Sequence, residues 1–378
     1  MKRILMYLHC ECNFRHKKMQ IKLFLLELLP IVIACNSTPK TDNYFNFPVQ
    51  EIELPEIGTK IKPEKIPELF SGFSGFWIED SLFVGSLPIL SDEVIMVGDI
   101  LSNKELGRFG KRGRGPQDFL SPVSFDLHDG HIFIFDIMTS KVYDLDLDRS
   151  IKENSSIFTD VYTIEKGDDT YMPITAIHCM NGRLLAYNTG NDPMSEDLYS
   201  IPDYVEFDLG SGKQIKEYSL FKDIPSQNKK REHEYVGIKA RMALTDCYLP
   251  KEGLICFVMK YIPQLNIFNP ESGEARGFRI KELSENSLTP SYIHYNSVCS
   301  YGNSIYALYI GEMINVANQG IINTELHVYD MKGYIKQRIP LDGTYVDCRA
   351  SESGLYLSKA QDGGADVGLY RINWDALQ

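Results

Sequence analysis

The stretch GRFGKRGRGPQDFLSPVSFDLHDGHIFIFDIMTSKVYDLDLD, residues 107–148, decides the fold of this chain. After a turn at 129–130, the apolar run 132–135 predicts a strand that is buried on both faces. A second turn follows at 138–140, and the period-two alternation over 142–147 predicts a half-buried strand. The rest of the chain repeats this unit in weaker form.

The turn with its apolar strand recurs at six places, which begin near Asp80, Asp129, Asn181, Glu252, Gly302 and Ser353. The steps between copies are 49, 52, 71, 50 and 51 residues. A four-stranded propeller blade takes about 40–50 residues, so four of the five steps correspond to one blade. The long step carries about twenty extra residues, too few for a blade. We assign them to an insertion at 190–202 and a polar excursion at 222–241.

One strand precedes each apolar strand and two follow it, with glycine-containing turns at 208–212, 269–273 and 330–333. Four strands repeated six times predict an all-β chain, a six-bladed β-propeller with four-stranded blades. The last copy runs out at Asn373 after its third strand, so we expect residues 49–54 to complete the last blade and close the ring. A two-sheet β-sandwich is the alternative, but it does not require a period near 50.

The composition agrees with a β-rich fold, since the aromatic residues are mostly the 22 Tyr and 19 Phe, with only 2 Trp. The formal net charge of −12 repels phosphate backbones, which argues against general nucleic-acid binding. The whole of 49–378 is expected to be one propeller domain.

Residues 1–34 resemble a secretion signal, with basic residues over 17–22, a short apolar run and a small residue before Cys35. Residues 32–35, Val-Ile-Ala-Cys, resemble the bacterial lipobox, in which the signal is cut before the cysteine and the thiol is acylated. Cys35 is therefore the predicted lipid attachment site and 35–48 a polar, lipidated tether. Met19 is an alternative start.

The joint before the second blade carries a spaced set of residues: Gly107, Gly110, Gly113, Gly115, Pro116, Phe119 and Pro122. It resembles the joint of NHL-like propellers and, more closely, that of TolB-like six-bladed β-propeller lipoproteins of Bacteroides-type bacteria. The resemblance covers most of residues 75–375. It implies a lipid-anchored envelope propeller, an outer-membrane lipoprotein that is periplasmic or surface-exposed, and it supplies no catalytic residue.

The same joint places four cations among its glycines: Arg108, Lys111, Arg112 and Arg114. Glycine-rich backbone with arginine can cradle an anion, so these residues are a candidate site for an anion or an acidic glycan. No Gly-Lys-Ser/Thr closes the segment as a nucleotide-binding loop would require. The alternative is structural: the glycines turn the chain between blades, and Phe119 and Pro122 fill the next blade.

The inner strands of four blades carry a second candidate set at one register: Asp126, His178, Asp246 and Asp347. Inner strands ring the central channel, so three carboxylates and an imidazole at one level could hold a divalent cation or polarise water. The alternative is that each side chain caps nearby backbone N–H groups. The cation is the one cofactor that the sequence suggests.

Five cysteines belong to the propeller: Cys179, Cys247, Cys256, Cys299 and Cys348. Four of them recur one per blade on inner strands, which are expected to diverge beyond the Cα separation of about 4.4–6.8 Å that a disulfide requires. We therefore predict small buried thiols.

Two functions remain. The first is a lipid-anchored binding or scaffold module for an envelope protein or glycan. The second is a metal-dependent hydrolase or lyase with its site at the channel mouth. No His-Glu-x-x-His, Gly-x-Ser-x-Gly or paired zinc-cysteine motif is present, and binding is the favoured reading.

Overall fold

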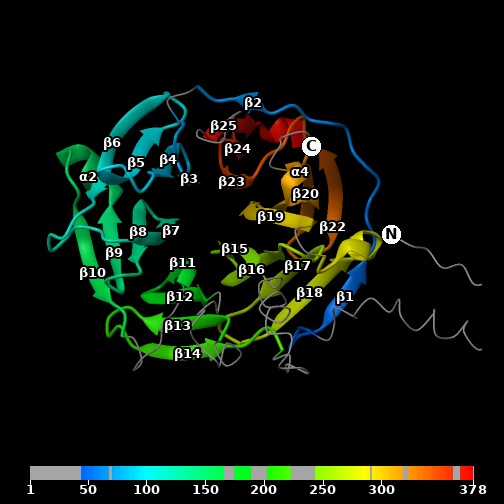
Figure 1. Ribbon diagram of the computed structural model, residues 1–378, viewed down its shortest axis with the longest axis horizontal. Coiled ribbons are helices and arrows are strands. Elements are labelled where there is room, and N and C mark those ends of the chain that lie inside the picture. Colours follow the sequence, from blue (N-terminus) through cyan, green and yellow to red (C-terminus); the bar gives the residue numbers. More distant parts are fainter. Residues whose placement is uncertain are drawn as a thin grey trace, which may run out of the picture. The chain divides into compact units, whose positions relative to one another are not determined.

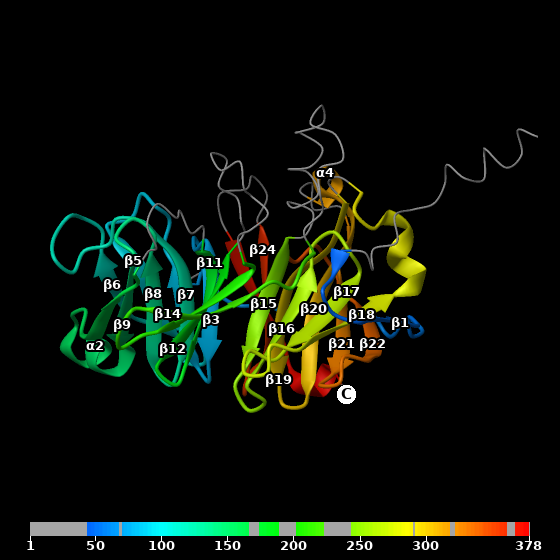
Figure 2. The same cartoon turned by 90° about the horizontal axis from the view of Figure 1, so that it is seen from below.

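The computed structural model describes residues 44–67, 70–165, 174–188, 202–222, 243–289, 292–317, 322–360 and 367–377. These residues form six sheets arranged in a ring (Figure 1). In the side view the inner strands stand along the ring axis (Figure 2). The predicted six-bladed β-propeller with four-stranded blades is confirmed.

The first three blades follow the chain in order. Blade 1 contains β3 (Gly75–Glu79), β4 (Leu82–Ser86), β5 (Glu93–Asp99) and β6 (Lys104–Lys111). Blade 2 contains β7 (Pro122–His128), β8 (His131–Asp136), β9 (Lys141–Asp146) and β10 (Phe158–Thr163). Blade 3 contains β11 (Ile174–Met180), β12 (Arg183–Asn188), β13 (Tyr204–Asp208) and β14 (Gln214–Tyr218).

Two of the remaining three blades, blades 4 and 6, also contain a strand from the N-terminal side of the chain. Blade 4 contains β15 (Leu244–Leu249), β16 (Leu254–Met259), β17 (Gln264–Phe268) and β18 (Ala275–Ile280), with β1 (Val49–Ile52) added at its outer edge. Blade 5 contains β19 (Tyr292–Tyr301), β20 (Ser304–Met313), β21 (Glu325–Asp330) and β22 (Ile335–Pro340). Blade 6 contains β23 (Asp347–Ser351), β24 (Gly354–Ala360), β25 (Val367–Ile372) and β2 (Glu64–Lys65).

The ring is closed by a different segment from the one predicted. Residues 49–54 do not complete the last blade, because β1 pairs in parallel with β18 of blade 4, where Ile52 lies opposite Ile280 in the same buried cluster. The chain then crosses the outside of the ring (Figure 1) and reaches blade 6, where β2 pairs antiparallel with β25. The residues of 49–54 favour a strand but do not specify its partner.

Each blade is buried on both faces because it lies between two neighbours. Ile132 and Ile134 of β8 belong to the core shared with blade 1, whereas Phe135 belongs to the core shared with blade 3. This confirms the expectation drawn from the apolar run 132–135. Between blades 6 and 1, Tyr356 and the ring-closing segment share a third core of this kind.

The predicted hairpin turns have the backbone that their residues favour. Asp129 and Gly130 have φ values of 51° and 74°, and Asn181 and Gly182 have 48° and 77°. Asn-Gly and Asp-Gly suit two-residue turns in which both central residues have positive φ.

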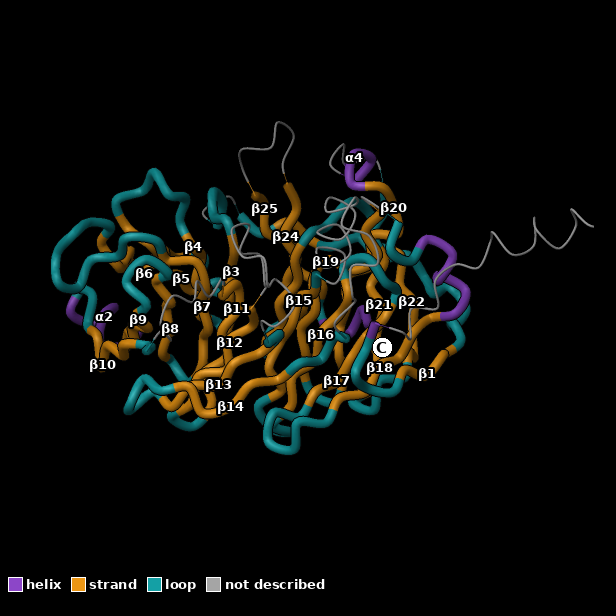
Figure 3. Tube along the Cα trace, turned by 60° about the horizontal axis from the view of Figure 1, so that its bottom comes forward, coloured by secondary structure: helices purple, strands orange, loops and turns teal. Residues whose placement is uncertain are grey.

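The described helices are short (Figure 3): α2 (Leu147–Glu153), η3 (Lys281–Asn286), α4 (Ile314–Ala317) and η4 (Trp374–Leu377). The α2 helix begins at Asp146, whose carboxylate accepts the Arg149 backbone N–H at 2.9 Å. None of the described helices is long and apolar enough to cross a membrane.

Candidate functional site

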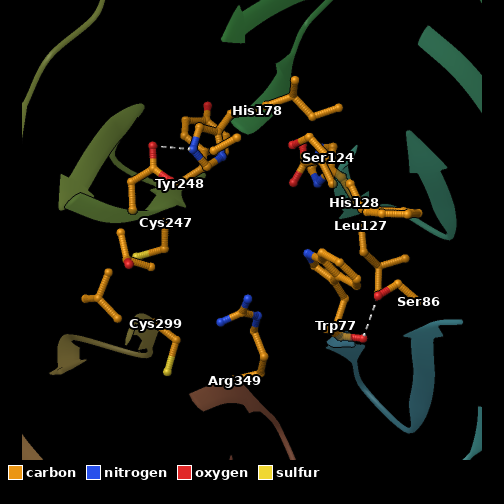
Figure 4. A pocket seen from close by; sticks show the side chains of 18 of the residues that line it. Trp77, Ser86, Ser124, Leu127, His128, His178, Cys247, Tyr248, Cys299 and Arg349 are labelled. Carbon is orange, nitrogen blue, oxygen red and sulfur yellow. Dashed lines mark hydrogen bonds and ion pairs between the residues drawn. The ribbon is translucent and has the colours of Figure 1, made fainter. Parts of the chain in front are cut away.

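The inner strands of all six blades enclose a cavity of about 510 Å³ on the ring axis. Its wall combines aromatic, ionisable and thiol side chains, among them Trp77, Asp126, His178, Asp246, Cys299 and Arg349. In Figure 4, Arg349 extends into the pocket between Trp77 and Cys299, on the side opposite His178. The cavity is the candidate ligand site.

Three of the four predicted channel residues come together on blades 2, 3 and 4. Asp246 Oδ2 lies 3.1 Å from His178 Nε2 and accepts the Tyr204 hydroxyl at 2.7 Å. Asp126 accepts the backbone N–H of Cys179 at 2.7 Å. Each carboxylate therefore accepts a hydrogen bond from a neighbouring blade. For Asp126 the donor is a backbone N–H group, which agrees with the backbone-capping alternative.

Burial and charge oppose each other in this group. Burial lowers the pKa of His178, but the Asp246 and Asp126 carboxylates outweigh it, so that the histidine pKa is raised. Burial raises the pKa of Asp246, but His178 and the Tyr204 hydroxyl bring it below its ordinary value. For Asp126 burial prevails, and its pKa is raised.

The fourth predicted residue, Asp347, is engaged elsewhere. Its Oδ1 accepts from Arg349 Nη1 at 2.7 Å, from the Ser297 hydroxyl and from the Cys348 N–H at 2.8 Å. Asp347 thus has other partners and does not line the cavity, and a metal site made by all four stays a prediction.

A different trio lies where the inner strands of blades 1 and 2 end. Within the described ranges, Glu79, His128 and Asp129 are the one group that places three candidate ligand atoms within 4.8 Å of one another. Both Glu79 oxygens already accept backbone N–H groups, from Asp129 at 2.9 Å and Gly130 at 2.8 Å. The trio therefore serves the turn between β7 and β8.

The sequence analysis did not identify Arg349, whose charged side chain extends into the cavity. Arg349 follows Asp347 by two residues on β23, so both side chains lie on the same face of the strand. The guanidinium also lies 5.7 Å from the Phe76 ring centre. An arginine at i+2 from an inner-strand aspartate was the available signal.

Aromatic rings cover the neighbouring walls of the cavity. Trp77 of β3 and Phe125 of β7 have ring centres 5.0 Å apart. On the other side, the ring centres of Tyr248 and His178 are 6.4 Å apart. The wall thus offers apolar faces together with polar groups, as small-molecule sites do.

At the joint, two of the four predicted cations have internal partners. Arg108 donates to the Glu105 carboxylate at 2.9 and 3.3 Å, and Arg112 donates to the Leu87 carbonyl at 3.0 Å. Lys111 and Arg114 are exposed. Anion binding by Arg108, Lys111, Arg112 and Arg114 stays a prediction.

The glycines of the joint hold a carboxylate of the chain itself. Asp118 Oδ2 accepts the Gly115 N–H at 2.8 Å, and a Cβ at Gly113 would lie 2.3 Å from the same oxygen. Phe119 is 1% exposed and packs against Tyr143 with ring centres 4.3 Å apart. These contacts favour the structural reading of the joint.

All five cysteines of the propeller are free, and all but the half-buried Cys247 are buried. Burial raises the pKa of the Cys179, Cys256 and Cys299 thiols. The prediction of free thiols is confirmed. Cys35 and the predicted signal peptide and tether up to residue 43 lie outside the described residues.

Comparison with known proteins shows a likeness in fold to solved structures. No family model matches the chain, and no curated protein matches it. The chain resembles two Bacteroides proteins of known structure. A member of the DUF4221 family from Bacteroides vulgatus has a TM-score of 0.57 at 11% identity, over 85% of this chain and 98% of its own. A "putative exported protein" from Bacteroides fragilis has a TM-score of 0.53 at 10% identity, over 87% of this chain and 99% of its own.

Both likenesses extend over nearly the whole of the other protein, so the entire propeller is shared and not a few blades. At these identities they concern the fold alone. Membership of the TolB-like or NHL-like group stays a prediction that rests on the joint at 107–122.

Proposed function

We propose that this chain is a binding module of the bacterial envelope and that its ligand site is the cavity on the ring axis. The observation that carries the proposal is the wall to which all six blades contribute, with aromatic faces and one guanidinium directed inward. The volume of about 510 Å³ falls within the range of about 300–1,000 Å³ of small-molecule sites.

The mixture of groups suits a saccharide from an envelope glycan. A sugar ring has an apolar C–H face, which packs on an aromatic ring such as Trp77, and a hydroxyl edge, which hydrogen-bonds. Thr175 and Ser300 add hydroxyl groups to the wall, and Tyr248 adds a second aromatic face. Large rigid aromatic side chains give contact area at low cost in conformational entropy.

Binding is favoured over metal-dependent hydrolysis by the contacts of the predicted ligands. The Arg349 guanidinium is bonded to Asp347 and would repel a cation held there. Asp246 is already shared by His178 and Tyr204. A metal bound by these carboxylates would have to displace both arrangements.

The envelope location is supported by the lipobox-like residues 32–35 and by the description of the Bacteroides fragilis protein of the same fold. Mass spectrometry of the chain from cell membranes tests it. We expect an acylated N-terminal peptide that begins at Cys35, and none from a Cys35→Ser chain. An unmodified Cys35 in a mature chain would overturn the anchor.

The intrinsic fluorescence of the chain tests the ligand site. The chain has 2 Trp, and Trp374 stacks on Tyr301 outside the cavity. In a Trp374→Phe chain the tryptophan emission therefore comes from Trp77 alone. We expect oligosaccharides released from envelope glycans to change the emission of the full chain in a non-glycosidic detergent.

The matched blocking variant is Thr175→Phe, at an exposed residue of the cavity wall. It should abolish the fluorescence response without unfolding the chain. If no saccharide changes the Trp77 emission, or if the response survives Thr175→Phe unaltered, the proposed site is wrong.

A further inference from the structure

The Arg349 guanidinium is fixed on one side only. Its Nη1 donates to Asp347 Oδ1 and to the Cys348 carbonyl, both at 2.7 Å, and to the Ser297 hydroxyl at 3.4 Å. Three acceptors on one nitrogen hold the group in place. The side chain keeps 24% of its surface exposed, and it is directed into the cavity (Figure 4).

The other nitrogens of the guanidinium remain available to a ligand. From the part of the chain that the structure describes, no hydrogen bond reaches Nε or Nη2 of Arg349. These two nitrogens form the edge of the guanidinium that matches the two oxygens of a carboxylate. Arg349 is thus held in position by the protein and presents an unused pair of donors.

The surroundings select a single negative charge. Asp126, Asp246 and Asp347 all belong to the inner strands, and Asp126 and Asp246 line the cavity. A dianion such as a phosphate monoester would face these carboxyl groups with only one unshared pair of donors to bind it. A carboxylate carries one negative charge, so these carboxyl groups repel it less than a dianion. Its two oxygens also lie in one plane, as the two donors of the guanidinium do.

The aromatic side chains of the wall indicate which chemical group the ligand carries beside its carboxylate. Trp77 lies beside Arg349 in Figure 4, and the paired rings of Trp77 and Phe125 give an apolar face next to the cation. A ligand that fits both features carries its carboxylate on a ring with an apolar face. We propose that the cavity binds a hexuronic acid residue of an acidic glycan, with its carboxylate on Nε and Nη2 of Arg349. The inference rests on the proposed function and names the class of sugar.

The test compares sugars that differ only in the carboxylate. Glucuronic acid and glucose, and galacturonic acid and galactose, are titrated into the Trp374→Phe chain while the Trp77 emission is followed. We expect both acids to bind at least about tenfold more tightly than the matching neutral sugars, since a charge-assisted hydrogen-bonded pair contributes about 1.5–3 kcal/mol.

The variant Arg349→Gln should weaken binding of the acids about 10–100-fold and leave the neutral sugars within about threefold. Arg349→Lys keeps the charge but not the paired donors, so an intermediate loss is expected. Arg149→Gln makes the same change at an exposed arginine of α2 and should alter neither affinity. Equal affinity of Arg349→Gln and the unmodified chain for the acids would overturn the inference.

Loss of Arg349 leaves Asp347 without its cation, so folding of Arg349→Gln must be checked by circular dichroism. If that variant does not fold, Asp347→Asn decides. It keeps an acceptor for Nη1 and removes the negative charge that competes with the ligand, so the acids should bind more tightly. Unchanged or weaker binding would contradict the inference.

The two proposals fail in different ways. If neutral and acidic sugars bind equally, the cavity is a saccharide site and only the uronic acid inference is wrong. If no sugar binds and no oligosaccharide does, the proposed function itself is wrong.

Discussion

The sulfur atoms of Cys299 and Cys348 lie 3.6 Å apart across the interface between blades 5 and 6. Both residues belong to inner strands, β19 and β23, which pack directly against each other. The two thiols are free, as predicted, but their sulfur atoms are in contact. The expectation that the Cα atoms of neighbouring inner strands lie too far apart for a disulfide stays a prediction. The two thiols need to approach by only about 1.5 Å to reach the length of a disulfide bond.

We predict that diamide joins Cys299 and Cys348. Oxidation of the two thiols forms the sulfur–sulfur bond and transfers two electrons and two protons to diamide. Burial raises the pKa of the Cys299 thiol, so the thiolate is scarce and the native chain should react slowly. Peptide mapping by mass spectrometry should identify the cross-link.

The controls for this reaction are single serine variants. Cys299→Ser should abolish the cross-link, whereas Cys179→Ser should keep it, because Cys179 is a buried thiol of blade 3. Cys247 and Cys256 face each other across β15 and β16 and are mapped separately. Absence of a peptide linking residues 299 and 348 after prolonged oxidation of the folded chain would refute the prediction.

Closure of the ring should depend on Ile66. This residue follows β2, is 8% exposed, and donates its N–H to the Leu369 carbonyl at 2.8 Å in blade 6. We expect Ile66→Ala to lower the free energy of unfolding by about 2–4 kcal/mol, measured by urea denaturation. The matched change Ile57→Ala, at a side chain that is 57% exposed, should cost less than about 0.5 kcal/mol. Equal effects of the two changes would show that the closing segment contributes no core.

The joint offers two adjacent positions with opposite expectations. Phe119 is buried against Tyr143, so Phe119→Ala should destabilise the chain by about 3–5 kcal/mol. Leu120 is 46% exposed, and Leu120→Ala should change the free energy of unfolding by less than about 0.5 kcal/mol. Thermal unfolding followed by circular dichroism compares them. A small effect at Phe119 would mean that the joint does not anchor blade 2.

The sequence predicted the blades because their signal is local. The turn at 129–130 and the apolar run 132–135 each need only a few residues, and both burial and φ agree with the pattern. The ring-closing strand was missed because β2 has two residues, Glu64 and Lys65, both exposed and without an apolar alternation. Its position is decided by the distant strand β25, which no local pattern encodes.

The candidate site was predicted in part for the same reason. The shared register of the inner strands brought Asp126, His178 and Asp246 together. The i+2 spacing places Arg349 on the same face of β23 as Asp347, but it could not show that the two side chains bond, because that contact depends on their rotamers and on Ser297 from the neighbouring blade. The repeated register of the inner strands thus located the channel. Which of its side chains remain free for a ligand depends on contacts between blades that the sequence pattern does not encode.

The pair of His178 and Asp246 should make stability depend on pH. Because the histidine pKa is raised in the folded chain, its stabilising contribution is full below its unfolded pKa of about 6.5 and is lost as pH rises through the folded value. Because the Asp246 pKa is lowered, its contribution is present above about pH 4 and is lost as pH falls through its folded value. The contribution of the pair is therefore largest between about pH 4 and 6.5.

We expect Asp246→Asn to cost about 3–5 kcal/mol of unfolding free energy near pH 5 and less near pH 8, because it leaves a buried imidazole without its main carboxylate. Urea denaturation of the unmodified chain and the variant at both pH values measures the difference. Asp92→Asn, at an exposed carboxylate, should have little effect at either pH. A deficit for Asp246→Asn that is equal at the two pH values, or larger at pH 8, would mean that His178 is not held in its charged form by Asp246.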